Sequence, residues 1–245
     1  MKAIGHFYFT YFSRRDENTL KSIFNRLKST PLAFLVLGLS HTVVLAQTAE
    51  LINTFQGHTD SVKSVAISKN GQQALTSSSD KTLKLWNLET REEIRTLTGH
   101  TDKVYSVIFF SDGNMALSGS GDNTIKQWNL LDGTTVHTFT GHTAPVRTIA
   151  LSPDEKTFLS GSEDKTLKLW NFQQKKALLT FQGHTKPIYT IAFSPDGHYA
   201  LSGSLDTTLK LWEIETGQEV RAFENHHAGI YAVAFSPDPN TAIPA

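Results

Sequence analysis

The chain contains no cysteine, which excludes disulfide bonds and thiolate chemistry. It also lacks a run of basic residues, and its formal net charge is zero. Residues 1–46 hold six Lys or Arg and two Asp or Glu, so the rest of the chain carries 17 basic and 21 acidic side chains. A slightly acidic body without a basic patch offers no electrostatic footprint for nucleic acid, and we expect no nucleic-acid partner.

Long apolar runs are equally scarce, and the one that stands out is residues 32–46 (LAFLVLGLSHTVVLA). About 15 residues is short for a membrane span, which needs roughly 20, but typical of a signal-peptide core. Val44 and Ala46 put small residues where signal peptidase reads, so cleavage would leave a chain that begins at Gln47. We therefore expect residues 1–46 to be a targeting segment that exports the protein to the periplasm or the medium.

Three alternatives remain for this segment. It can be an uncleaved anchor that holds the protein at a membrane, or a strand or helix buried in the fold. Translation can also begin downstream of Met1. Contact with a membrane is expected only through these residues.

The body of the chain, residues 47–245, is built from copies of one pattern at a period of 42 residues. Each full copy opens with Gly-His and contains a Trp 28 residues after the His. The copies cover residues 57–98, 99–140, 141–182 and 183–224, with a partial copy at 225–245. A period of 20 to 50 residues indicates a repeat architecture, and this outranks any single motif.

The copy that begins at Gly99 predicts four short strands, at residues 103–109, 115–118, 124–128 and 136–139. Turn residues separate them, including a tight turn at 119–122. The result is an antiparallel meander that cannot bury both of its faces. Each meander must lean on the next, and a radial stack of four-stranded sheets, a β-propeller, does this with few exposed edges.

The recurring Gly-His, the Asp of a Ser-Gly-Ser-x-Asp turn and the Trp six residues later resemble the WD-repeat β-propeller family over roughly residues 50–245. The residue after each Trp departs from the family's Asp, being Asn87, Asn129, Asn171 or Glu213. The resemblance implies an all-β propeller with four complete four-stranded blades and a partial fifth.

A His, a hydroxyl residue, an Asp and a Trp recur in every blade. The four quartets are His58, Thr76, Asp80 and Trp86; His100, Ser118, Asp122 and Trp128; His142, Ser160, Asp164 and Trp170; His184, Ser202, Asp206 and Trp212. Ser, His and Asp together suggest nucleophilic catalysis, but a catalytic centre needs one pocket and not four. The resemblance implies instead that each quartet is a hydrogen-bonded structural brace, with the Trp as a packing anchor between blades. Histidines one blade apart cannot share a coordination sphere, so we expect no metal and no cofactor.

Recognition is expected where equivalent positions differ. In the first strand these positions are Lys63, Tyr105, Arg147, Tyr189 and Tyr231; before the turn Asp they are Ser79, Gly121, Glu163 and Leu205. The resemblance implies that both sets lie on one face, and Tyr and Arg dominate interface hot spots. We therefore predict a partner-binding ring there; the alternative is that these exposed positions simply vary without constraint.

The sequence thus favours a non-catalytic scaffold that docks partner proteins or peptides on one propeller face. The alternative is a propeller enzyme, or a small-molecule or glycan binder, that acts through the central channel. Off-pattern candidates for that role are His137, His198, His227, Glu163 and Arg147.

The two ends of the repeat array resemble parts of one blade. Residues 51–55 match a fourth strand and residues 230–235 match a first strand, so they could share a fifth blade. Pro239 stands where Gly71, Gly113 and Gly197 stand in other copies, at a turn expected to need positive φ. We expect four blades and a fragment, from a longer propeller of six or seven blades or a strained ring of five. Open edges in such an array invite association.

Overall fold

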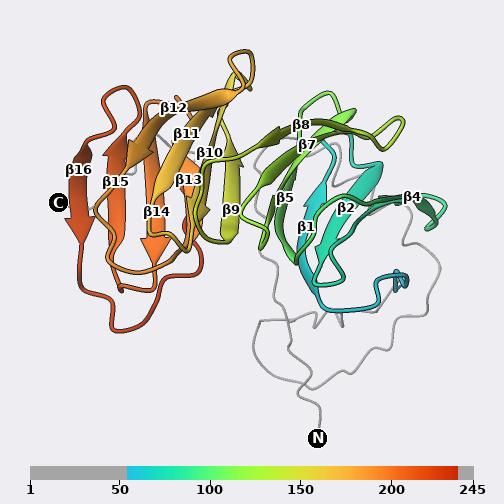
Figure 1. Cartoon of the computed structure of the whole chain (residues 1–245), viewed down its shortest axis with the longest axis horizontal. Coiled ribbons are helices and arrows are strands. Elements are labelled where there is room, and N and C mark those ends of the chain that lie inside the picture. The colour runs from blue at the N-terminus through green and yellow to red at the C-terminus, as the bar shows by residue number, and fades with distance from the viewer. Residues whose placement is uncertain (1–53, 237–245) are drawn as a thin grey trace, which may run out of the picture. The chain divides into compact units, whose positions relative to one another are not determined.

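The computed structural model describes residues 54–236, in which sixteen strands form four antiparallel sheets (Figure 1). In each sheet the strands pair in chain order, so every sheet is a simple four-stranded meander. These residues contain no helix that could cross a membrane. The expected targeting segment, residues 1–46, and the expected turn at Pro239 lie outside the described residues.

The sheets follow the expected blades. The first contains β1 Val62–Ile67, β2 Gln73–Ser78, β3 Leu83–Asn87 and β4 Glu93–Leu97. The second contains β5 Val104–Phe109, β6 Met115–Ser120, β7 Ile125–Asn129 and β8 Thr135–Phe139. The third contains β9 Val146–Leu151, β10 Thr157–Ser162, β11 Leu167–Asn171 and β12 Lys176–Phe181. The fourth contains β13 Ile188–Phe193, β14 Tyr199–Ser204, β15 Leu209–Glu213 and β16 Glu219–Phe223.

The strand boundaries of the second blade lie within one residue of the sequence prediction, except at the end of β6. The tight turn expected at residues 119–122 begins later, because β6 continues to Ser120 and Gly119 pairs in the ladder with Ile125. Gly119 is there for packing and not for turning. A Cβ at this position would lie 2.8 Å from Val146 Cγ1 of the third sheet, so a side chain here would force Val146 or β9 to shift.

The turn between the first two strands of each blade needs a left-handed backbone. Gly71, Gly113 and Gly197 have φ values of 70°, 72° and 76°, which glycine adopts at no steric cost. The third blade has Glu155 there, with φ 55°. Its carboxylate accepts hydrogen bonds from the backbone N–H and the hydroxyl of Ser111, at 2.7 Å and 3.0 Å. The acid thus ties the third blade to the turn of the second.

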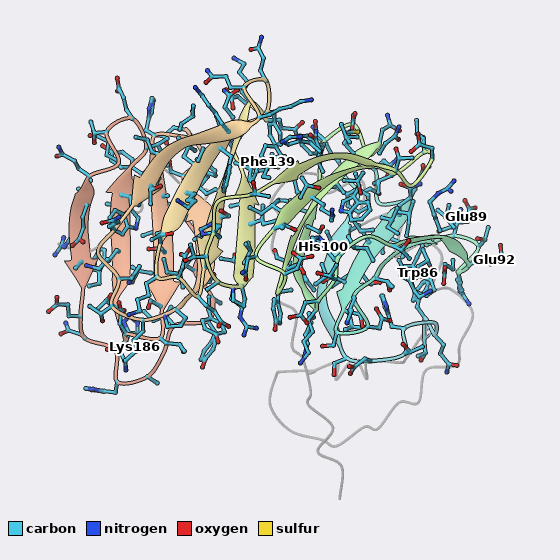
Figure 2. The ribbon with its side chains drawn as sticks, in the orientation of Figure 1. Trp86, Glu89, Glu92, His100, Phe139 and Lys186 are labelled. Atoms are coloured by element: carbon cyan, nitrogen blue, oxygen red, sulfur yellow. The ribbon has the colours of Figure 1, made fainter. Side chains whose placement is uncertain are left out.

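The hydrophobic core lies between neighbouring sheets. In the first junction Leu75, Leu83, Leu85 and Leu97 of the first sheet pack with Val104, Val107, Phe109, Ala116, Trp128 and Leu130 of the second sheet and its loops. The next two junctions repeat this arrangement one and two blades further along. Phe139 of β8, labelled in Figure 2, lies at the second junction. Its ring centre is 4.9 Å from that of Phe158 and 5.7 Å from that of Trp170. Every sheet therefore needs a neighbour to bury its faces.

Residues 230–236 follow the fourth sheet in the position of a further first strand, although no strand is formed there. Ile230 is 8% exposed, and its Cγ2 atom lies 2.5 Å from where a Cβ on Gly203 would be. The N–H of Val233 donates to Thr190 Oγ1 at 3.2 Å. The same bond joins the N–H of Ile149 to Ser106 Oγ, also at 3.2 Å. The segment therefore docks as a fifth blade would begin.

Candidate functional site

The four groups of each quartet form one hydrogen-bonded chain. In the second blade His100 Nδ1 lies 2.7 Å from Asp122 Oδ2, and His100 Nε2 lies 2.8 Å from Ser118 Oγ. The indole N–H of Trp128 donates to the same hydroxyl at 2.8 Å. The other three quartets repeat these contacts at 2.7 to 2.8 Å. The chain joins the loop before the first strand to the second and third strands.

The partners determine where the protons lie. A carboxylate only accepts, so His100 Nδ1 carries the proton given to Asp122. An indole only donates, so the hydroxyl of Ser118 accepts from Trp128, and with a neutral imidazole it gives its own proton to His100 Nε2. This tautomer is assigned from the network. All polar atoms of the chain are then satisfied, which is the condition under which a buried polar network rigidifies a fold.

The quartets have the distances of a Ser-His-Asp catalytic triad but not its accessibility. The side chains of Ser118, Ser160 and Ser202 are 0% exposed. A nucleophile must reach its substrate, and each of these hydroxyls is already engaged by a Trp. The quartet serines therefore cannot attack a substrate in this structure.

Hydrogen bonding controls the charge of the quartet aspartates. Burial by itself would raise the pKa of Asp164, but the hydrogen bonds from His142 and Thr166 outweigh it and hold the pKa far below the ordinary value. The pKa values of Asp80, Asp122 and Asp206 are lowered by the same balance. Burial lowers the pKa of His184, against the opposing effect of Asp206. The aspartates thus stay ionised well into the acid range.

The candidate site is a row of variable side chains that touch from blade to blade, here called the Tyr–Arg row: Tyr105, Arg147, Tyr189 and Tyr231. The guanidinium carbon of Arg147 lies 3.8 Å from the ring centre of Tyr105 and 5.1 Å from that of Tyr189. The rings of Tyr189 and Tyr231 meet edge to face, with centres 5.3 Å apart. These contacts join four successive blades, counting the partial fifth.

Glu163 neutralises the cation in the middle of the row. Arg147 donates from Nε to Glu163 Oε1 at 2.6 Å, and its Nη2 also donates to that oxygen. The side chains of both residues are only partly exposed, at 22% and 27%. The row therefore presents an aromatic surface. The guanidinium of Arg147 at its centre is fixed by its ion pair with Glu163 and leaves no unpaired charge there.

Backbone hydrogen bonds place the two sets of variable positions side by side. In the third blade the N–H of Glu163 donates to the carbonyl of Pro145, two residues before Arg147, at 2.9 Å. The N–H of Gly121 bonds in the same way to Lys103 at 2.8 Å. Tyr105 lies directly against Gly121, where a Cβ would be 3.3 Å from the tyrosine ring. The two sets of variable positions therefore lie side by side because of the backbone of the blade, whichever side chains they carry.

The remaining predicted contact positions are less uniform. Lys63 is exposed at the start of β1, and Leu205 is half-buried beside Gly229 and Tyr231. Ser79 is only 8% exposed, so its side chain offers little contact surface. The ring expected from the sequence is therefore concentrated on the second, third and fourth blades and the segment that follows them.

The off-pattern histidines do not assemble with other polar groups into a second site. His137 packs edge to face on Phe139, with ring centres 4.6 Å apart, and its pKa is lowered by burial and by Lys175. His198 and His227 are exposed. Within residues 54–236, no group of three or more His, Cys, Asp or Glu side chains could hold a metal ion.

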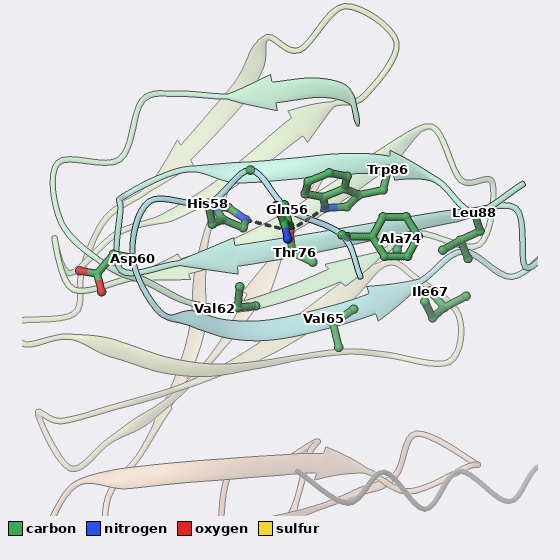
Figure 3. Close-up of a pocket in the computed structure, with 12 residues that line it drawn as sticks. Gln56, His58, Asp60, Val62, Val65, Ile67, Ala74, Thr76, Trp86 and Leu88 are labelled. Carbon is green, nitrogen blue, oxygen red and sulfur yellow. Dashed lines mark hydrogen bonds between the residues drawn. The ribbon is translucent and has the colours of Figure 1, made fainter. Parts of the chain in front are cut away.

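A second surface feature was not singled out from the sequence. On the first sheet Val62, Val65 and Ile67 are exposed, and with Trp86 and Phe55 they line a hollow (Figure 3). These side chains are equivalent to buried residues of later blades. They are exposed because no described sheet packs on this side of the first sheet. The repeat pattern could have indicated this exposed face, because no full copy precedes the first copy in this sequence to cover it.

The family model described as WD domain, G-beta repeat matches the chain five times, at residues 49–87, 91–129, 133–171, 175–213 and 217–243. The three middle matches each begin with the outer strand of one sheet and end with the third strand of the next. Comparison with individual curated proteins gives no match.

Proposed function

Because this chain belongs to the WD-repeat family, we propose that it is a non-catalytic scaffold that docks a partner protein or peptide on the Tyr–Arg row. WD repeats generally mediate protein–protein interactions. The observation that supports this surface is the continuous contact of Tyr105, Arg147, Tyr189 and Tyr231, at positions where the repeat otherwise varies.

The row has the chemistry of a binding hot spot. Tyrosine and arginine offer large contact areas with few rotatable bonds, and both are enriched among the residues that dominate interface energetics. Glu163 and the two tyrosine rings hold Arg147 in one orientation, so less side-chain entropy is lost when a partner binds. Tyr231 is 66% exposed and provides the most accessible ring.

The test begins with a peptide library selected for binding to the wild-type protein. A variant with Tyr105, Arg147 and Tyr189 all changed to Ala should bind the selected peptides at least about tenfold more weakly, since each lost hot spot costs on the order of 1–2 kcal/mol. Tyr199→Ala, which removes a 37% exposed tyrosine outside the row, is the matched control and should leave affinity unchanged. Equal binding by the triple variant, with its thermal unfolding unchanged, would exclude the row.

We further propose that residues 1–46 direct export and are removed after Ala46. The support is the apolar core at residues 32–46 with small residues at Val44 and Ala46. Expression of the full chain in a bacterium, followed by intact-mass analysis of the exported fraction, should give a protein that begins at Gln47. Recovery of the full-length chain from the membrane fraction would favour the anchor instead.

A further inference from the structure

The first sheet has an uncovered apolar face, here called the open face: Val62, Val65 and Ile67, with the exposed Phe55 and the buried Trp86 beside them. Val62, Val65 and Ile67 are 48%, 38% and 54% exposed. The equivalent residues of β5 are Val104, Val107 and Phe109, at 0%, 6% and 8%. The two sets have the same chemistry, and they differ because the first sheet covers the second while no described sheet covers the first.

The chain itself shows what fits such a face. At all three junctions the cover is the opposite face of a WD blade, which presents two or three branched aliphatic residues and a Leu or Phe from the outer strand. The fourth sheet carries that set as Leu201, Leu209, Leu211 and Phe223, and the segment that begins at Ile230 packs on this sheet. The occupant with demonstrated complementarity to the open face is therefore another part of a WD repeat.

Each end of the array carries a different part of one blade. At the beginning, Phe55 lies against Trp86 with ring centres 5.5 Å apart, as Phe139 lies against Trp170 and Phe181 against Trp212, both at 5.7 Å. Phe55 thus takes the place of the last outer-strand residue of a preceding blade. At the other end, Ile230 and Val233 take the place of a first strand. Residues in the positions of an outer strand and of an inner strand of one blade thus lie at opposite ends of the described part of the chain.

One side of the segment 230–236 is exposed at the position where a following blade would pack. Ala66, Ile108 and Ala150 each pack into the junction with the following sheet. Ala234 is the equivalent residue of the segment 230–236, and it is exposed. The segment therefore offers a small apolar surface in the register that meets the first strand of a next blade.

We propose that the open face is a self-association surface, occupied by the segment 230–236 of a second copy of this chain. The contact is head to tail, with Ala234 of one copy facing Val65 and Ile67 of the other. A head-to-tail contact joins unlike surfaces, so two copies close into a ring if the rotation permits and otherwise extend as a filament. The driving force is the removal of this apolar face from water.

The experiment uses two charge variants of the full chain and their mixture. Ile67→Glu blocks the open face and Ala234→Glu blocks the tail; both side chains are exposed, so folding should be preserved. Val136→Glu, at a 46% exposed valine of β8, is the matched control. Sedimentation velocity over a concentration series should show assembly of the wild type and of Val136→Glu, and monomers for each blocked variant alone.

The mixture decides the geometry. A head-blocked copy retains its tail and a tail-blocked copy retains its open face, so an equimolar mixture should form a dimer of one copy of each. A wild type that stays monomeric overturns the proposal, with hydrogen exchange at Val65 and Ile67 then showing whether the chain's own residues cover the face. A mixture that stays monomeric, or blocked variants that assemble by themselves, also overturns it.

Discussion

Replacing Gly161 by alanine should force the third and fourth sheets apart. A Cβ at this position would lie 2.8 Å from Ile188 Cγ2 of the next sheet, 2.8 Å from Thr148 Cγ2 and 3.3 Å from Ile191 Cγ2. Carbon atoms do not approach this closely, so the neighbouring strands must shift or their side chains must leave their rotamers. The φ of Gly161 is not in the left-handed region, so the backbone itself tolerates alanine and the effect comes from packing.

The magnitude follows from two opposing contributions. Overpacking of a well-packed core costs about 1–3 kcal/mol, while a Gly to Ala change stabilises by about 0.4–1 kcal/mol through the unfolded chain. The net loss for Gly161→Ala should be about 1–2 kcal/mol. For a domain of this size that lowers the Tm by about 2–8 °C.

The first blade supplies the internal control, because Ser77 occupies the position of Gly161 there. Ser77 is 0% exposed, and its hydroxyl has no hydrogen-bond partner among the described residues. An unsatisfied buried hydroxyl costs about 1–3 kcal/mol, so Ser77→Ala should raise stability by roughly 1 kcal/mol or more. The same residue, alanine, should thus destabilise one blade and stabilise another.

Thermal and urea unfolding of Gly161→Ala, Ser77→Ala and the wild type measure both effects. The reasoning is refuted if Gly161→Ala is as stable as the wild type, since close approach of β13 would then not depend on the missing Cβ. A Ser77→Ala variant less stable than the wild type would show that its hydroxyl has a partner after all.

Two further predictions concern acid and the glutamate turn. The folded-state pKa of Asp164 is lowered, so the ionised carboxylate stabilises the fold fully above the unfolded pKa of about 3.9, and this stabilisation is lost as the pH falls below that value. Asp164→Asn should therefore lower the Tm at pH 7 and make the Tm decline less steeply between pH 5 and 3. Equal slopes of Tm against pH for the variant and the wild type would contradict this. At the turn of the third blade, Glu155→Ala and Glu155→Gly both lose the hydrogen bond from Ser111, but only glycine adopts the positive φ of 55° without strain. The alanine variant should therefore unfold at a temperature about 2–4 °C below that of the glycine variant. The reverse order of unfolding temperatures would refute the strain argument.

Much of the fold was predictable because its determinants are local. The quartet residues lie 18 and 22 residues from the His, inside one blade, so their spacing alone places them in one meander once the strands are recognised. The WD-repeat resemblance and the four-bladed fold were confirmed. The predicted end of β6 was two residues too early, because glycine is typical of turns and Gly119 was assigned to one. Gly119 instead lies in the strand, in close contact with Val146 of another sheet.

The candidate site was only partly predictable. Variation between the repeats indicated Tyr105 and Arg147 as candidate contact residues. It could not predict the distance between their side chains, because equivalence of two positions does not determine how far apart they lie in space. Ser79 was expected at the surface and is buried, since burial depends on neighbours in three dimensions. His137 was a candidate for chemistry and instead packs on Phe139, its neighbour on the same face of β8.

The sequence by itself determined the period, the four-stranded unit and the polar quartet in each unit, because all of these rest on short-range spacing and on strand pairing between neighbours in the chain. Only the tertiary structure decided that Arg147 lies between Tyr105 and Tyr189, and that Val65 and Ile67 are left uncovered. These facts depend on how one sheet packs against the next, and the same residue type is buried or exposed according to whether a neighbouring sheet is there.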